Sequence, residues 1–177
     1  MKYLILLLFI FLSESSYSQS PFVEGSLGVN TLTSVKEEGY SESGLGLQLN
    51  AKGGFFLSDA YGGVDLNFSV INPEDSYFNK VEENSYGVVA GVSLAGISRV
   101  YFTLYPYSVC SHDQGDYKGS GIKLGGALYL PFLKEANVVF EFRSLEYDKK
   151  KIGSSYQKVP KLEVNSLSIG FGFFFGS

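Results

Sequence analysis

The sequence predicts an all-β fold in which eight antiparallel strands run up and down around a closed barrel, and three observations support this prediction. Apolar and polar residues alternate in eight successive segments, as in strands whose two faces have different surroundings. Long polar connections alternate with tight ones, which places all the long loops at one end. The 177 residues include 21 Gly, 15 Phe and 13 Tyr but no Trp, and only 18% are charged. This composition is unusual for a soluble domain.

The first 18 residues are expected to be a secretory signal peptide. Lys2 supplies a positive charge, Tyr3–Leu12 is an unbroken apolar run, and Ser16-Tyr17-Ser18 fits a small-x-small cleavage site. A membrane anchor is the alternative interpretation, but the apolar run is shorter than the ~20 residues that a membrane-spanning helix needs. Cleavage after Ser18 leaves residues 19–177 as a single barrel domain.

The eight alternating segments are mostly about ten residues long, which is the length that a tilted strand needs to cross a bilayer. In chain order they are Pro21–Asn30, Gly44–Phe56, Tyr61–Val70, Tyr86–Leu94, Val100–Ser108, Gly121–Leu130, Asn137–Leu145 and Leu162–Phe175. The expected long connections are Thr31–Ser43, Ile71–Ser85, Val109–Ser120 and Glu146–Lys161. The expected tight turns are Leu57–Ala60, Ala95–Arg99 and Pro131–Ala136.

One face of every segment is apolar, and this alternation justifies each strand in turn. The residues expected on the apolar face are Val23, Gly25, Leu27 and Val29; Leu45, Leu47, Leu49, Ala51, Gly53 and Phe55; Val64, Leu66, Phe68 and Val70; Tyr86, Val88, Ala90, Val92 and Leu94; Val100, Phe102 and Leu104; Ile122, Leu124, Leu128 and Leu130; Val138, Phe140 and Phe142; and Leu167, Ile169, Phe171, Phe173 and Phe175. This face contains no Asp, Glu, Lys or Arg.

The opposite face carries three acids and three bases: Glu24, Lys52, Asp65, Lys123, Glu141 and Arg143. A soluble surface would normally carry more charges, and an inward apolar face would need large interlocking side chains. An eight-stranded barrel is too narrow for free water flow, so its interior must be filled, and equal numbers of opposite charges avoid isolated buried ions. We therefore expect a transmembrane barrel with a lumen charge network. Scattered charges on a soluble, lipocalin-like carrier are the alternative.

The last strand carries a motif of its own. The pattern Ser168-x-Gly170-x-x-Phe173-x-Phe175 resembles the carboxy-terminal β-signal of bacterial outer-membrane proteins, which their insertion machinery reads. The resemblance implies that the two phenylalanines face lipid at the periplasmic end, in an aromatic girdle with Phe55. The family usually ends on the aromatic residue, whereas Gly176 and Ser177 follow it here.

As a whole, residues 19–177 resemble the OmpA/OmpX-type eight-stranded outer-membrane barrels. The resemblance implies a monomer in the bacterial outer membrane, with outer-membrane lipid, lipopolysaccharide and the barrel-insertion machinery as partners. No peptidoglycan-binding domain follows the barrel, so that anchoring role of the OmpA type is not expected.

The sequence offers little for catalysis or for cofactor and metal binding, and neither a cofactor nor enzymatic activity is expected. One His and one Cys cannot build a usual zinc site, and the net charge of −4 argues against nucleic acid as a partner. Ser111-His112-Asp113 invites comparison with barrel enzymes that modify lipid A. Adjacent residues of an extended chain point in opposite directions, however, so His112 is expected to be a solvated loop residue. Cys110 is expected to be a small filler near a strand end.

The expected function is a structural or adhesion-like surface-interaction role through the long external loops. Lys149, Lys150 and Lys151 are candidates for contact with lipopolysaccharide phosphates. A narrow pore for small solutes and a lipid A-modifying enzyme are the alternatives.

Overall fold

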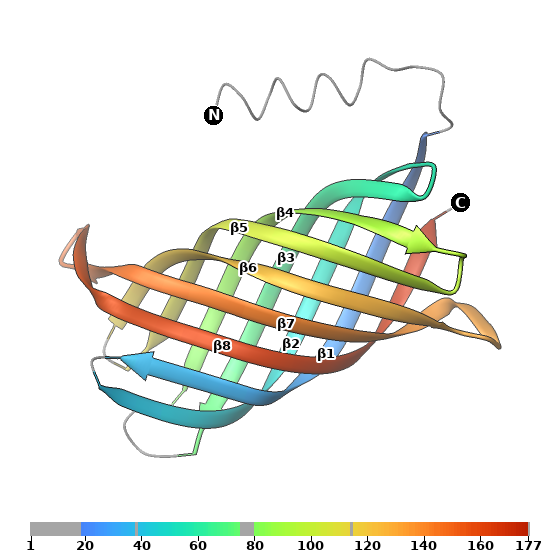
Figure 1. Ribbon diagram of the computed structural model, residues 1–177. Helices are drawn as coiled ribbons and strands as arrows, with labels where there is room; N and C mark the ends of the chain where they lie inside the picture. Colours follow the sequence, from blue (N-terminus) through green and yellow to red (C-terminus); the bar gives the residue numbers. More distant parts are fainter. Residues whose placement is uncertain (1–18, 38, 75–79, 114, 177) are drawn as a thin grey trace.

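Eight antiparallel strands close into a barrel in which each strand pairs with the next and β8 pairs with β1 (Figure 1). This is a computed structural model, and it describes residues 19–37, 39–74, 80–113 and 115–176. The strands are β1 (Gln19–Glu37), β2 (Tyr40–Leu57), β3 (Ala60–Pro73), β4 (Val81–Leu94), β5 (Ser98–His112), β6 (Gly115–Leu130), β7 (Leu133–Ile152) and β8 (Ser155–Gly176). The predicted up-and-down barrel is confirmed. The predicted signal peptide, residues 1–18, lies outside the described residues.

The apolar faces of the strands point outward. Leu47, Phe140 and Ile169 are 60%, 42% and 44% exposed, whereas Gln48 and Asn50, which flank Leu49 on β2, are almost fully buried. Exposed leucines, valines and phenylalanines recur on all eight strands and form a continuous belt around the barrel, which we call the apolar belt. A contiguous apolar surface of this extent marks contact with a membrane. No helix that could cross a membrane is found among the described residues.

The strands are longer than the sequence predicts, and most of the expected long loops are wrong. β1 and β2 meet in a tight turn at Gly39, β5 and β6 meet after Asp113, and β7 and β8 meet at Gly153. Gly39 (φ 91°) and Gly153 (φ 64°) supply the left-handed conformation that such turns need. Only the β3–β4 connection, residues 74–80, remains long.

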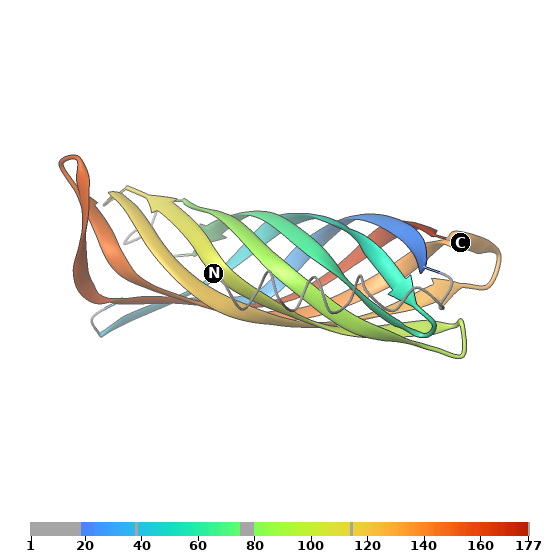
Figure 2. The ribbon, with the colours of Figure 1, turned by 90° about the horizontal axis from the view of Figure 1, so that it is seen from above.

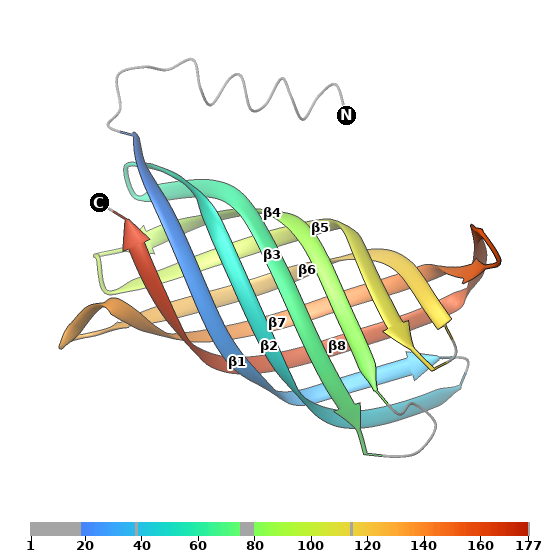
Figure 3. The same ribbon diagram turned by 180° about the vertical axis from the view of Figure 1, so that it is seen from behind.

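These extensions make the two ends of the barrel different. We call the end where β1–β2, β3–β4, β5–β6 and β7–β8 connect the hairpin end, and the opposite end the turn end. The β7–β8 hairpin continues beyond the pairing of β8 with β1, which stops at Leu162 (Figure 2). Figure 3 shows β1 and β8 lying side by side where the ring closes.

A bulge in β5 changes the direction of one predicted side chain. The register between β5 and β6 shifts between Tyr105 and Ser108, around Pro106, which has no N–H to donate. In the predicted strand Val100–Ser108, unbroken alternation sets Tyr101, Thr103, Tyr105 and Tyr107 against the apolar face, so Tyr107 is expected to point inward with Tyr105. The bulge turns Tyr107 outward, where it is 41% exposed, so this part of the prediction is wrong.

Two apolar clusters lie inside the barrel, on either side of its charged middle. The cluster at the turn end consists of Phe22, Tyr61, Val89, Tyr101, Ala127, Val139 and Phe174, with Phe56 and Tyr129 packed against it. The cluster at the hairpin end consists of Val35, Ile71, Val81, Tyr105, Cys110, Tyr117, Leu145, Tyr147, Leu162 and Val164. Cys110 is a buried free thiol near the end of β5.

Candidate functional site

The candidate site is the charged lumen between the two apolar clusters. All six charged residues that the sequence placed there point inward, and each is at most 2% exposed. The structure adds Glu83 and Arg99, which are both fully buried. We call these four acids and four bases the ionic network: Glu24, Lys52, Asp65, Glu83, Arg99, Lys123, Glu141 and Arg143. Each of β1 to β6 contributes one member and β7 contributes two, so the network joins seven of the eight strands.

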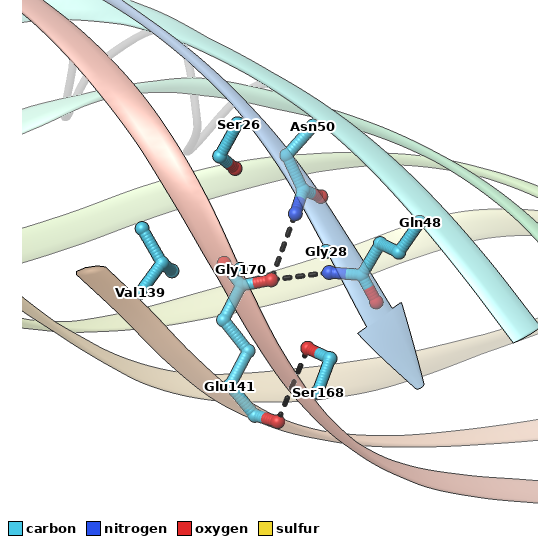
Figure 4. Close-up of a pocket in the computed structure, with 8 residues that line it drawn as sticks. All are labelled: Ser26, Gly28, Gln48, Asn50, Val139, Glu141, Ser168 and Gly170. Carbon is cyan, nitrogen blue, oxygen red and sulfur yellow. Dashed lines mark hydrogen bonds between the residues drawn. The ribbon is translucent and has the colours of Figure 1, made fainter. Parts of the chain in front are cut away.

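Glu141 of β7 is the centre of this network. Its carboxylate accepts hydrogen bonds from Tyr101 (2.6 Å) and Asn50 (2.8 Å) and a further short one from Gln48. Figure 4 shows the two amides pointing at this carboxylate from β2. The ammonium groups of Lys52 and Lys123 lie 3.2 Å and 3.1 Å from the same carboxylate oxygen. These donors hold the carboxylate in one orientation.

Ion pairs extend from Glu141 in both directions around the lumen. On one side, Lys52 Nζ lies 3.7 Å from Glu24 Oε1, and Glu24 accepts a hydrogen bond of 3.0 Å from Arg99. On the other side, Lys123 Nζ lies 2.7 Å from Asp65 Oδ2, which also accepts a hydrogen bond from Thr103. Six charged groups therefore form one continuous chain of alternating sign.

A separate pair lies toward the hairpin end. Arg143 Nη2 lies 2.5 Å from Glu83 Oε2, and Tyr147 donates a hydrogen bond of 2.9 Å to the other oxygen of the same carboxylate. Ser108 connects this pair to the wall, because its hydroxyl lies 2.9 Å from the Tyr147 hydroxyl and 2.7 Å from that of Ser85. The charged lumen thus ends in a hydroxyl network beneath the apolar cluster of the hairpin end.

Aromatic rings cover the opposite end of the ionic network. The guanidinium of Arg99 lies 4.0 Å from the ring centroid of Phe174 and 5.2 Å from that of Tyr129. Phe22 packs on Phe174 and Tyr61 with centroid distances of 5.6 Å and 5.3 Å. These contacts are cation–π and aromatic packing interactions, and they close the turn end of the lumen.

Small residues on β1 and β8 make room for the side chains around Glu141. Ser26 and Gly28 of β1 are the register partners of Asn50 and Gln48 of β2, and Ser168 and Gly170 lie next to them on β8 (Figure 4). The pocket that they border has no space wide enough for a water molecule. Ser168 donates a long hydrogen bond of 3.5 Å to the backbone carbonyl of Glu141. The middle of the lumen is therefore packed at this seam.

The four residues of the resemblance to a β-signal divide between the two faces of β8. Ser168 and Gly170 belong to the lumen wall just described. Phe173 and Phe175 point outward and are 58% and 60% exposed, and Phe55 of β2 is 53% exposed near the same end. The pattern therefore places small groups on the inner face and two rings on the apolar belt.

The structure separates the three consecutive lysines. Lys149 and Lys151 are exposed on the outer face, and the Nζ of Lys151 lies 3.7 Å from Asp116. Lys150 alternates to the other face, where its Nζ lies 5.0 Å from the centroid of the Tyr117 ring. The three ammonium groups therefore do not form one surface.

His112 is not the solvated loop residue that the sequence predicts. It is the last residue of β5, is 8% exposed and stacks on Tyr117 with ring centroids 4.9 Å apart. Burial lowers the pKa of its imidazole below the ordinary value near 6.5. Ser111 instead donates a hydrogen bond of 2.8 Å to Asp116. Among the described residues, no group of His, Cys, Asp and Glu could hold a metal ion.

Glu83 and Arg99 were missed because each lies just outside the segment that the alternation marked as a strand. Arg99 was assigned to the turn before Val100, and Glu83 to the connection before Tyr86. If the in–out alternation is continued back by one residue from Val100 and by three residues from Tyr86, Arg99 and Glu83 both point inward. Glu83 and Arg99 have opposite charges, so adding both keeps the numbers of inward-facing acids and bases equal.

Solved structures provide the comparison that decides the fold. Neisserial surface protein A aligns with a TM-score of 0.62 at 12% sequence identity, over 89% of this chain and 99% of that one. The chain has the fold of an eight-stranded outer-membrane β-barrel. The resemblance to OmpA/OmpX-type barrels is thereby confirmed at the level of fold.

Two further solved barrels align more loosely. Ail, the attachment invasion locus protein of Yersinia pestis, has a TM-score of 0.49 at 16% identity, over 90% of this chain and 99% of that one. The outer-membrane protein OprG from Pseudomonas aeruginosa has a TM-score of 0.39 at 14% identity, over 90% and 97%. No protein-family model matches the sequence of this barrel, and no curated protein matches it either.

Proposed function

We propose that this chain is an integral protein of the bacterial outer membrane with a closed lumen, and that it has a structural or adhesion-like role through its hairpin end. The apolar belt supports the location, because large exposed apolar side chains on all eight strands are stable only against lipid. The barrel fold, shared with a neisserial surface protein, is consistent with it.

The ionic network is the observation that carries the functional part of the proposal. Opposite charges from seven strands meet across the axis, and an aromatic cluster and an apolar cluster lie above and below them. A pore for solutes needs a continuous wet path, and this lumen is filled by side chains that neutralise one another. The parts of the barrel available to partners are then its outer wall and its hairpin end.

Membrane fractionation and conductance measurements test the two parts separately. We expect the full chain in the outer-membrane fraction, with a folded form that migrates differently from the heated form on a gel. In planar bilayers we expect no steady openings. Extraction without detergent would favour a soluble carrier, and sustained single-channel currents would favour the narrow pore.

We also propose that the barrel is not an enzyme. Ser111 and His112 alternate along β5, and each has its own neighbours in Asp116 and Tyr117. Expression in a strain with defined lipid A should leave the lipid A mass spectrum unchanged. A loss or gain of an acyl chain would instead support the lipid A-modifying alternative.

A further inference from the structure

Three lysines lie in one row across the outer wall near the hairpin end. Lys118 of β6 is paired in register with Lys149 of β7, and Lys149 is paired with Lys158 of β8. Residues directly opposite in adjacent strands point to the same face with Cβ atoms ~5 Å apart. We call these three residues the lysine row.

Two of the neighbouring carboxylates form ion pairs with other lysines, and a third, Asp148, precedes Lys149 and acts on Lys161. Asp116 pairs with Lys151 at 3.7 Å, and Glu146 pairs with Lys161 at 2.6 Å. On the other side of Lys118, its register partner is the uncharged Val109 of β5. Like charges placed directly opposite each other destabilise a sheet. A bound anion would relieve the repulsion among the three lysines.

Tyrosines hold the first lysine of the row in place. The Nζ of Lys118 lies 4.5 Å from the ring centroid of Tyr156 and 4.9 Å from that of Tyr107. Tyr107 in turn packs against Tyr86 on the outer face, with centroids 5.9 Å apart. Cation–π contacts with two rings reduce the freedom of the ammonium group without removing its charge.

The row lies just beyond the apolar belt. Tyr86 and Tyr107 are partly exposed rings at the hairpin-end border of the belt, where membrane barrels place aromatic girdles. Val109, two residues after Tyr107, is the β5 partner of Lys118. At a rise of ~3.4 Å per residue in tilted strands, the row begins roughly 5 Å beyond the girdle. This is the depth of lipid headgroups.

We propose that the lysine row binds phosphate groups of the lipopolysaccharide that surrounds the barrel. The inference rests on the proposed location in the outer membrane and names a partner for its outer wall. An ammonium group is a compact charge with three donors and suits phosphate oxygens. The lysine row replaces the run of three consecutive lysines as the candidate contact. Lys149 belongs to both sets, and Lys118 and Lys158, which share its face, take the places of Lys150 and Lys151.

The test is the affinity of the refolded barrel for lipopolysaccharide micelles at low salt. The triple variant Lys118→Gln, Lys149→Gln and Lys158→Gln should bind at least about ten-fold more weakly, since a basic residue near an anionic membrane surface contributes a several-fold effect. The matched control is Lys36→Gln, Lys80→Gln and Lys161→Gln. It makes the same change in net charge at exposed lysines that each have a carboxylate neighbour in Glu163, Glu82 or Glu146. The control should change affinity by less than about two-fold.

Two further arms identify the ligand. Dephosphorylated lipopolysaccharide should bind the unmodified barrel as weakly as the triple variant binds the intact lipid. Inorganic phosphate alone should not displace the micelles, and full displacement would overturn the assignment to a lipid headgroup. Equal losses in the two triple variants, or no loss in either, would overturn the row as a site.

A footprint on the unmodified chain covers the case in which the triple variant does not fold. Acetylation of Lys149 and Lys158 should be slowed by intact lipopolysaccharide and not by the dephosphorylated lipid, while Lys36 should react equally in both. A barrel that fractionates with the outer membrane but shows no such protection contradicts the inference alone. A barrel absent from that membrane contradicts the proposed function as well.

Discussion

Glu141 is the residue on which most of the lumen depends. Four side chains donate hydrogen bonds to its carboxylate, and the ammonium group of Lys123 lies 3.1 Å away. Removing a buried charge leaves its partners under-compensated, and this costs more than the intact pair contributes. Lys52 and Lys123 are the partners that would be affected.

We expect Glu141→Gln to lower the free energy of unfolding by about 3 kcal/mol or more, because two buried ammonium groups lose a shared counter-charge. Urea unfolding in lipid vesicles, followed by tyrosine fluorescence, measures the change. The matched control is Glu82→Gln, which removes an exposed partner of Lys80 and should cost less than about 1 kcal/mol. Equal effects of the two substitutions would mean that the lumen is hydrated.

His112 predicts how the hairpin end responds to pH. Burial holds its pKa below that of an unfolded chain, so the unfolded state takes up a proton first as the pH falls below about 6.5. The hairpin end should therefore lose protection from amide exchange between pH 7 and pH 5. Glu37, Asp113 and Lys150 also act on this imidazole, Glu37 and Asp113 favouring its charge and Lys150 opposing it.

His112→Gln should reduce this pH dependence of amide exchange, since the substituted side chain does not titrate. Amides of β8 near the turn end serve as the internal reference. A pH dependence of the same size in the variant would assign it to the carboxylates instead of the imidazole.

Side-chain direction could be predicted from the sequence wherever alternation was regular. The inward placement of Glu24, Lys52 and Glu141 follows from parity alone, because their strand neighbours are apolar. The direction of Tyr107 could not be predicted, because a bulge between Tyr105 and Ser108 reverses the in–out alternation. Pro106 is the only sign of this bulge in the sequence. The partners within the lumen could not be predicted either, since pairing across the axis depends on the stagger of the closed ring.

At the scale of single strands, β8 is limited by its contact with β1. A Cβ added at Gly170 would lie 2.5 Å from the backbone carbonyl oxygen of Leu27, closer than real Cβ contacts come, and that oxygen belongs to the β1 ladder. At Gly25 of β1, by contrast, nothing lies within 4 Å of the added atom. At this point of the seam, an added side chain therefore fits on the outer face at Gly25 but not on the inner face at Gly170.

Gly170→Ala should reduce the fraction of chains that reach the heat-modifiable folded form, and Gly25→Ala should not. Both substitutions add the same methyl group to the same pair of strands, so propensity effects cancel. Refolding into vesicles followed by gel electrophoresis of unheated samples gives the two fractions. Equal yields would show that β8 can move away from β1 at this point.

Strand length was the element-scale property that the sequence did not predict. Beyond the apolar belt the outer face meets water, so outward positions such as Lys36, Glu146 and Lys161 read as loop. The inner face continues to alternate with buried residues, including Val35, Leu145 and Leu162. The part of a strand beyond the apolar belt has a charged outer face and an apolar inner face. When only its charges are counted, it therefore resembles a polar loop.

At the scale of the whole barrel, the ionic network contains four acids and four bases and is shielded from solvent. Salt screens exposed charges and acts far less on buried ones. The free energy of unfolding should therefore change by less than about 1 kcal/mol between low and ~1 M KCl, whereas affinity for lipopolysaccharide should fall steeply. A loss of several kcal/mol in high salt would show that electrolyte reaches the lumen.

The distribution of the ionic network over seven strands has a consequence for biogenesis. A lone strand that entered the hydrocarbon would bring an unpartnered ion with it, at a cost of several kcal/mol, and nearly every strand of this chain carries one. Stepwise threading is thus the expensive route. We therefore expect the charged side chains of different strands to pair before or during insertion, so that a nearly complete barrel enters the bilayer.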